Sequence, residues 1–417
     1  GRTYLRELLL AADRGVRVRL LMDDIRTAGF DEALTALDAH PNLEVRIFNP
    51  FSRRGGRSMA FVTRVGQANR RMHNKSMTVD GAASIVGGRN IGDEYFAARE
   101  DVNFGDLDVL GFGRFAADVG LAFDAYWNHE LALPVAALVD TGKSDLQALQ
   151  RAYRASLDEA VAKAADSQYA DALRSNLLAA IQREPDALVW ATYRLVYDDP
   201  SKADPRASAA RGMIDALGSV VDEAQTELLA ISPYFVPRRA GIEYFRGLRE
   251  RGVRTVIVTN GLASTDVPAV HSGYAPSRKP LLEMGAELWE VRPDAQVSGT
   301  VEAGVGLSRS SLHTKAFAVD RERLFVGSFN WDPRSARLNT EMGVVIDSPA
   351  LAGGVADRVE AALPQAAYRV ELDDRNRIAW VGQQSGETER YRTEPGTGFW
   401  QRFAAGLLGI LPIDSQL

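Results

Sequence analysis

The stretch RMHNKSMTVDGAASIVGGRN at residues 71–90 returns later in the chain as SLHTKAFAVDRERLFVGSFN at residues 311–330. The recurrence includes two of the five histidines in the whole chain. A repeat at such long spacing predicts two copies of one folded unit. The matched positions keep a constant offset of 240: His73 and His313, Lys75 and Lys315, Asp80 and Asp320, Gly87 and Gly327, and Asn90 and Asn330.

The similarity between the copies extends upstream of the motif. AADRGVRVRLLMDD (11–24) is matched by GLRERGVRTVIVTNG (247–261), and NLEVRIFNP (42–50) is matched by AELWEVRP (286–293). Each copy therefore indicates a helix, a glycine turn and a β-branched strand, then a second helix and strand, and then the motif. This order predicts the α/β class, with a layered sheet and flanking helices in each copy.

Each motif is expected to form a β-hairpin. Strand-like runs flank residues 80–83 in the first copy and residues 320–323 in the second. A four-residue loop is compatible with a hairpin of this kind. Its register would pair Val79 with Ser84, His73 with Asn90 and His313 with Asn330.

Side-chain alternation separates the motif residues by role. His73 and Lys75 are two positions apart, so they should project from one face of their strand. Asp80 and Asp320 have the opposite parity and begin the turns, so we expect them to be structural residues. A duplicated fold commonly has its halves related by a pseudo-twofold axis, which would bring both His-x-Lys faces into one site between the halves.

Composition limits the classes of function. The chain of 417 residues carries 49 basic and 55 acidic residues, and its net charge of −6 disfavours a nucleic-acid partner. It contains no cysteine, which excludes disulfides, thiol catalysis and thiolate metal sites. No run of about 18 apolar residues is present, so the sequence as given predicts a soluble or membrane-peripheral protein.

Two histidines and two lysines in one site suit phosphodiester exchange. One imidazole can attack phosphorus while the other protonates the leaving oxygen, which divides the reaction into two easier steps. The lysines and the amides of Asn90 and Asn330 can hold the non-bridging oxygens as charge builds up. This scheme requires neither a metal ion nor a cofactor.

A histidine nucleophile needs an acceptor to orient its far nitrogen. Candidates follow each motif: Asp106 in FGDLDVLGF and Glu341 in NTEMGVVID, each ahead of an apolar strand. Aligning TEMGVVI with GDLDVLG pairs Glu341 with Asp106, although Asp108 remains possible. The alternative is that these carboxylates are ordinary residues at strand edges.

The motif residues HNKSMTVD with GGRN, and HTKAFAVD with GSFN, resemble the paired HxKxxxxD motifs of the phospholipase D superfamily. The resemblance covers nearly the whole chain. It is similar in particular to the bacterial cardiolipin synthase branch and its C-type members, through GGRNIGDEYF, FDAYWN (123–128), ISPYFVP (231–237) and LPID (411–414).

The resemblance implies two phospholipase D-like α/β domains with an active site at their interface. It implies a phosphatidyl-histidine intermediate on His73, with His313 as the general acid that then activates the acceptor. If the acceptor is the glycerol hydroxyl of phosphatidylglycerol the product is cardiolipin, and if it is water the product is phosphatidic acid. The motifs do not choose between these outcomes. A nuclease of the same superfamily and a catalytically inactive scaffold are the remaining alternatives.

We expect a first half at residues 1–135, a helical connector at 136–188, a second half at 189–365 and a C-terminal extension at 366–417. The implied partners are phospholipid substrates and a membrane surface, with the protein peripheral on the bacterial cytoplasmic membrane. The oligomeric state is left open.

Two features of the ends depart from a simple repeat. The second copy has a strand, ELLAISPYF (227–235), ahead of its first helix, whereas the first copy opens directly in that helix. The equivalent strand is therefore expected to be missing, as in an N-terminally truncated chain, at a cost to the stability of the first half. The C-terminal stretch GFWQRFAAGLLGILPI (398–413) predicts an apolar helix that either contacts a membrane or packs on the protein's own core.

Overall fold

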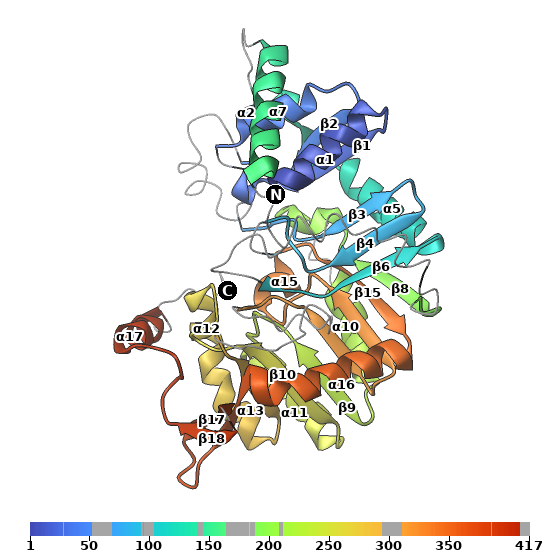
Figure 1. The fold of residues 1–417 in the computed structure, drawn as a ribbon. Coiled ribbons are helices and arrows are strands. Elements are labelled where there is room, and N and C mark those ends of the chain that lie inside the picture. The colour runs from blue at the N-terminus through green and yellow to red at the C-terminus, as the bar shows by residue number, and fades with distance from the viewer. Residues whose placement is uncertain are drawn as a thin grey trace.

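The computed structural model describes residues 1–27, 29–51, 69–92, 95, 104–139, 145–163, 183, 188–207, 212–293, 311–384 and 386–408. Strands and helices are mixed along the whole chain, and the two copies of the repeat form separate regions of sheet with helices against them (Figure 1). The predicted α/β class with two repeated units is confirmed.

The second copy builds one continuous sheet in the order β16-β11-β10-β9-β13-β14-β15. β8 adds to its β15 edge, and β17 and β18 extend it past β16. β9, β10 and β11 run parallel, and β13 pairs antiparallel with β9. The strands are β8 (Thr192–Tyr197), β9 (Glu227–Ile231), β10 (Arg254–Asn260), β11 (Glu287–Val291), β13 (Ala316–Val319), β14 (Arg323–Gly327), β15 (Met342–Asp347), β16 (Ala367–Leu372), β17 (Ile378–Gln384) and β18 (Glu387–Tyr391).

The first copy follows the same plan with its sheet in two pieces. In the described part of this copy the orders are β7-β2-β1 and β3-β4-β6, so nothing corresponds to β9 between β1 and β3. As predicted, the described part of the first copy has no counterpart of the first strand, and its sheet is divided at that position. Its strands are β1 (Val18–Asp23), β2 (Leu43–Phe48), β3 (Ser76–Val79), β4 (Ala83–Gly87), β6 (Asp108–Phe112) and β7 (Ala132–Pro134).

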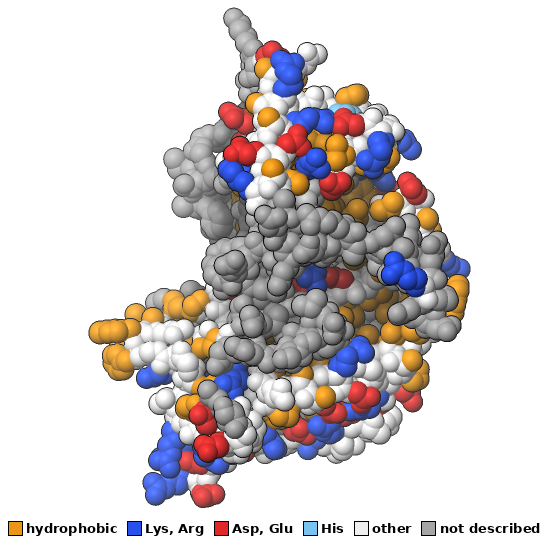
Figure 2. All heavy atoms as spheres, in the orientation of Figure 1, with side chains coloured by type: hydrophobic (Ala, Val, Ile, Leu, Met, Phe, Trp, Pro, Cys, Tyr) orange, Lys and Arg blue, Asp and Glu red, His pale blue; other side chains and the backbone are white. Residues whose placement is uncertain are grey.

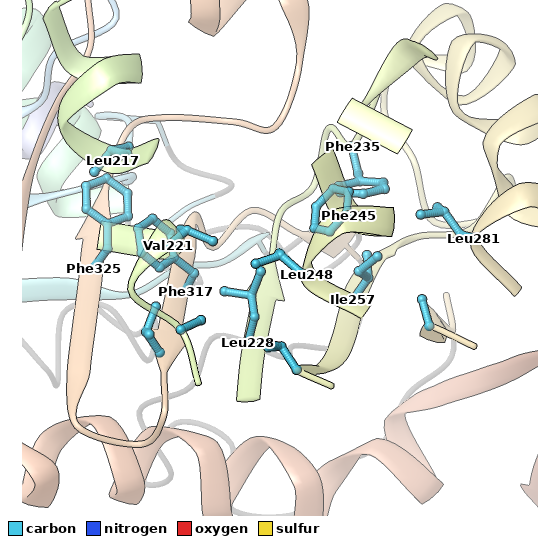
Figure 3. Packing of buried hydrophobic residues seen from close by; sticks show 14 of the residues in the cluster. Leu217, Val221, Leu228, Phe235, Phe245, Leu248, Ile257, Leu281, Phe317 and Phe325 are labelled. Atoms are coloured by element: carbon cyan, nitrogen blue, oxygen red, sulfur yellow. The ribbon is translucent and has the colours of Figure 1, made fainter. Parts of the chain in front are cut away.

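Helices cover both faces of the second sheet. On one face, Leu217 of α10, Phe245 of α11 and Leu281 of α13 pack against alternate strand residues such as Ile257 and Phe317 (Figure 3). α16 covers the other face. The helices of this copy are α10 (Gly212–Asp222), α11 (Arg238–Glu250), α12 (Pro268–Tyr274), α13 (Arg278–Glu283), α15 (Pro333–Arg337) and α16 (Pro349–Ala366), with short 3₁₀ turns η4 (Pro200–Ala203) and η5 (Ala275–Ser277).

The first copy has a smaller core that includes part of the predicted connector. Leu157 of α7 is fully buried with Leu9, Leu37 and Ile47. Since α7 packs in this way, this helix of the predicted connector belongs to the core of the first copy. The helices here are α1 (Arg2–Asp13), α2 (Asp31–Asp38), α5 (Arg114–Trp127), α6 (Val135–Leu138) and α7 (Leu146–Lys163), with the 3₁₀ turn η1 (Asp24–Arg26).

The predicted hairpin register is wrong by one residue. Val79 pairs with Ala83, and Val319 pairs with Arg323, so each loop has three residues. The reason lies in the turns, where two consecutive residues take positive φ, 53° and 62° in the first copy and 54° and 58° in the second. Such a turn reverses the chain tightly, and His73 is therefore not opposite Asn90. Asp80 and Asp320 do begin these turns.

The C-terminal residues contribute both sheet and helix. β16 pairs with β11 and so completes the second sheet. α17 (Phe399–Leu408) packs on α12, where the Ser272 hydroxyl donates to the Ala405 carbonyl at 2.7 Å. Residues 409–413 of the predicted apolar stretch lie outside the described residues. The division of the chain into these four ranges stays a prediction.

Candidate active site

The two copies join at the start of each motif. β12 (Ser311–Leu312) pairs in parallel with β5 (Phe104–Gly105), and Met72 bridges to Thr340. The contacts are reciprocal, because the His73 N–H donates to the Thr340 carbonyl at 2.9 Å and the His313 N–H donates to the Gly105 carbonyl at 2.9 Å. Each motif histidine is thus held at the boundary by the backbone of the other copy.

The carboxylates expected to orient the histidines cross this boundary. His73 Nδ1 lies 2.8 Å from Glu341 Oε2, and His313 Nδ1 lies 2.6 Å from Asp106 Oδ2. Each copy therefore supplies the carboxylate for the histidine of the other copy. Asp108, the alternative to Asp106, instead pairs with Arg89 at 2.6 Å. Each contact leaves the imidazole Nε2 as the nitrogen available for chemistry.

The two carboxylates have different surroundings. Glu341 Oε2 also accepts from the Ser328 hydroxyl at 2.5 Å. The matched position in the first copy is Gly88, where a Cβ would lie 2.6 Å from Asp106 Oδ1, closer than real side chains come. Glycine at this position makes room for Asp106 beside His313. A serine at the same place would collide with the carboxylate.

This difference is reflected in the pKa of each acid. Burial would raise the pKa of Glu341, but attraction by His73 and Lys75 and hydrogen bonds from His73 and Ser328 hold it below its ordinary value. Burial raises the pKa of Asp106 to about 6, against the attraction of Lys315. Glu341 is therefore the more firmly ionised of the two.

The motif lysines are buried close to the histidines. Lys75 Nζ donates to the His73 carbonyl at 2.7 Å, and Lys315 Nζ donates to the His313 carbonyl at 2.5 Å. Burial lowers the pKa of Lys75 to about 7 and that of Lys315 to about 8. Repulsion from Lys315 also contributes to the low pKa of Lys75, so both ammonium groups belong to one site.

The two imidazoles differ in exposure. The side chain of His73 is 25% exposed, whereas that of His313 is 5% exposed. Burial lowers the pKa of both, and for His313 the nearby charges of Lys315, Lys75 and His73 lower it further. His313, whose pKa lies well below its ordinary value, is therefore neutral near neutral pH. His73 is the more accessible ring.

The motif asparagines take different positions. Asn90 Nδ2 donates to the Tyr95 hydroxyl at 2.8 Å, and that hydroxyl lies 3.4 Å from His313 Nε2. Asn330 is buried, its backbone N–H donates to the Ser335 hydroxyl, and its side-chain oxygen has no partner among the described residues. A buried amide with an unmatched oxygen can still receive a bond from a substrate group.

Sequence reasoning missed three residues of the site. Ser328 was not singled out as a partner of Glu341, nor Tyr95 as a neighbour of His313, although both lie within quoted motif segments. Asp198 was also missed. Its carboxylate accepts from the Glu341 N–H at 3.0 Å and from Lys202 Nζ at 2.7 Å, and so fixes the backbone that carries Glu341. The only available signal for Asp198 was a carboxylate at the end of a strand.

A search of the described residues for three or more histidine or carboxylate side chains placed to share one metal ion finds no such group.

Comparison with known proteins gives one family model over both copies. The model described as "Cardiolipin synthase, PLD-like domain" matches residues 1–127 and 217–363. Cardiolipin synthase C of Escherichia coli strain K12 is 41% identical over 425 residues, which cover 99% of this chain and 87% of that protein. An uncharacterized protein of Helicobacter pylori strain 26695 is 32% identical over 414 residues, 98% of this chain and 80% of that protein.

Among solved structures, phosphatidylserine synthase of Haemophilus influenzae Rd KW20 aligns with a TM-score of 0.51 at 16% identity. The alignment covers 88% of this chain and 85% of that one. At this identity the likeness concerns the fold.

Proposed function

This chain belongs to the family of cardiolipin synthases with phospholipase D-like domains, and on that premise we propose that it transfers a phosphatidyl group to phosphatidylglycerol. It is a phospholipase D-type phosphodiester transferase. The donor is a second phospholipid and the product is cardiolipin. The observation that supports the proposal is the crossed pair of contacts, Glu341 on His73 and Asp106 on His313, which leaves the Nε2 of each imidazole for the reaction.

In the first step, His73 Nε2 attacks the phosphorus of the donor lipid. A P–N bond forms, the P–O bond to the headgroup breaks, and His313 gives a proton to the leaving oxygen. The greater exposure of His73 and its firmly ionised partner Glu341 support this assignment. The negative phosphodiester offsets Lys75 and Lys315, two of the groups that lower the pKa of His313, and so favours its protonated form.

In the second step, the acceptor hydroxyl attacks the same phosphorus. Its proton passes to His313 Nε2, the P–N bond breaks, and the electron pair returns to His73. The neutral state of His313 suits this role as a base. Lys75, Lys315, Asn90 and Asn330 would hold the non-bridging oxygens in both steps, because a buried ammonium or amide stabilises charge that develops in the transition state.

The halves that carry this chemistry are proposed at residues 1–135 and 189–365, joined by a connector at 136–188 and followed by an extension at 366–417. Asp80 and Asp320 are proposed as structural residues of the two turns. The two ranges matched by the family model support the two halves.

We propose that α17 contacts the surface of the bacterial cytoplasmic membrane. Four of its side chains are strongly exposed: Phe399 (65%), Trp400 (75%), Phe403 (55%) and Leu407 (54%). They form the apolar projection at the left of the molecule (Figure 2). Aromatic and apolar side chains on one side of a short helix suit a bilayer interface.

The position of α17 relative to the site supports this contact. α17 packs on α12, and the charge of Asp266, just ahead of α12, opposes the lowering of the Lys315 pKa by burial. α17 is thus connected, through α12, to a residue whose charge acts on the site that must receive a lipid. Separately, none of the helices in the described part of the chain has the length and apolar character of a membrane span.

Replacing Trp400 and Phe403 with serine should weaken sedimentation with phosphatidylglycerol vesicles by about tenfold or more, because each buried ring contributes roughly 1.5–3 kcal/mol. Leu121→Ser, which changes another exposed apolar side chain on α5, is the control and should bind like the wild type. Unchanged sedimentation of the double variant would exclude α17 as the contact.

The function is tested by incubating the purified protein with phosphatidylglycerol, with and without phosphatidylethanolamine, and identifying products by mass spectrometry. Cardiolipin should form in the wild type and not in His73→Ala. Phosphatidic acid without cardiolipin would replace the synthase assignment by a hydrolase. Loss of turnover in chelator, restored by added metal, would contradict the metal-free scheme.

A further inference from the structure

Tyr95 covers the reactive nitrogen of His313. Its ring lies 4.9 Å from the His313 ring at 76°, and it stacks on Phe104 at 4.8 Å. Its hydroxyl lies 3.4 Å from His313 Nε2, and the side chain is only 6% exposed. His313 therefore has Asp106 on one ring nitrogen and a tyrosine hydroxyl next to the other.

Hydrogen bonds hold both the hydroxyl and the backbone of Tyr95 in place. Asn90 Nδ2 donates to the Tyr95 oxygen at 2.8 Å, and this oxygen lies 3.4 Å from His313 Nε2. The backbone is held as well, because Arg89 donates to the Tyr95 carbonyl at 2.6 Å while it pairs with Asp108. The hydroxyl is thus fixed beside the base rather than placed there by chance.

The second copy does not repeat this arrangement. The position matched to Tyr95 is Ser335, whose hydroxyl accepts from the Asn330 N–H. The position matched to Arg89 is Phe329. Within the described part of the chain, the cover belongs to one histidine of the pair, in line with the lower exposure of His313 than of His73.

We propose that Tyr95 determines which acceptor receives the phosphatidyl group, by occupying the place beside His313 Nε2 that an attacking oxygen must take. This inference rests on the proposed function. A lipid alcohol brings binding energy from the rest of its molecule and displaces the tyrosine hydroxyl. A water molecule has only its own contacts to offer and is excluded.

Both competing reactions use the same atoms. The oxygen of water or of the alcohol forms a bond to phosphorus, its proton passes to His313 Nε2, and the P–N bond to His73 breaks. Water gives phosphatidic acid and phosphatidylglycerol gives cardiolipin. Removing the tyrosine hydroxyl leaves a space of water size beside the base, so hydrolysis should gain relative to transfer.

The test is the ratio of phosphatidic acid to cardiolipin formed from phosphatidylglycerol vesicles in ¹⁸O-labelled water. Tyr95→Phe should raise this ratio about fivefold or more, the factor that one hydrogen bond contributes, with ¹⁸O in the phosphatidic acid. Phe104→Leu keeps the hydroxyl but removes the ring that stacks on Tyr95, and should raise the ratio by less. A purely structural role would lower both products together.

Tyr193→Phe is the matched control, because its hydroxyl donates to Asp118 away from the site, and its ratio should equal that of the wild type. If the wild type is active and both Tyr95→Phe and Phe104→Leu give the wild-type ratio, the role of Tyr95 is overturned. The proposed function would not be affected by that result. A wild type that releases no headgroup would overturn the proposed function and this role with it.

Discussion

The sheet of the second copy is continuous from β16 to β15, whereas that of the first copy is divided between β1 and β3. The strand that follows the His-x-Lys pair within each motif shows the effect, because β13 is buried along its length and β3 is exposed along its length. Yet the two histidines have equivalent backbone contacts, each 2.9 Å from a carbonyl of the other copy. The geometry of the site is therefore maintained by contacts between the copies more than by the sheet within each copy.

The largest effect should come from removing either imidazole. His73→Ala and His313→Ala should each lower kcat/KM on the order of 10⁴-fold or more. The two should differ with a diacylglycerol p-nitrophenyl phosphodiester, whose leaving group needs no proton. Mass spectrometry after a quench in denaturant at neutral pH, which spares the acid-labile P–N bond, should find a phosphatidyl adduct in His313→Ala and none in His73→Ala. An adduct on protein lacking His73 would reverse the assigned roles.

The second largest loss of activity should come from replacing the orienting carboxylates. Glu341→Gln and Asp106→Asn should each cost on the order of 10³- to 10⁴-fold in kcat, since the amide no longer holds the imidazole in the required tautomer.

The Asp106 and Glu341 variants should differ in the pH dependence of kcat/KM. Because the pKa of Asp106 is raised to about 6, it takes up a proton as the pH falls through 6, and kcat/KM should decline there. The pKa of Glu341 is lowered, so it gives no such decline in that range. The acid limb near pH 6 should be absent from the residual activity of Asp106→Asn and retained in Glu341→Gln. The same limb in both variants would assign it to another group.

The turns offer a stability comparison. The Asp320 carboxylate accepts from the backbone N–H groups of Gln225, Thr226 and Glu227, and so ties the turn to the start of β9. Asp80 has the same positive φ, but the described residues of its copy contain no such strand. Asp320→Ala should therefore lose about 2–3 kcal/mol more than Asp80→Ala in urea denaturation. Equal losses would mean that the backbone conformation alone accounts for both.

The smallest effect is expected at Ser328, which donates a hydrogen bond to Glu341, whereas Gly88 stands at the matched position beside Asp106. Ser328→Gly gives the second motif the glycine of the first and removes one hydrogen bond from Glu341. We expect about a fivefold loss in kcat, with little change in KM. Wild-type kcat would show that His73 alone is sufficient to hold Glu341.

Much of the fold followed from the repeat. The two copies, their α/β class and the strand lacking in the first copy could be predicted because apolar periodicity and matched motifs are local properties of the sequence. The hairpin register could not, since it depends on two consecutive residues with positive φ, and Asp-Arg in the second turn gives little sign of that conformation.

The two carboxylates beside the histidines could be named from the sequence, but the histidine that each one contacts could not. Asp106 and Glu341 were found by aligning the copies, yet the alignment says nothing about which histidine each one meets. That depends on how the copies dock. Tyr95 and Asp198 were missed for the same reason, because their partners lie more than a hundred positions away along the chain.

The crossed carboxylates have a consequence for how such a chain could arise and be made. In a symmetric homodimer, each subunit can supply the carboxylate that contacts the histidine of the other subunit at the twofold axis. Two such subunits joined end to end would keep this exchange of carboxylates and become free to diverge, as Ser328 and Gly88 have done. During translation, the first motif would emerge without its acid partner and stay inert until the C-terminal half had been synthesised and docked.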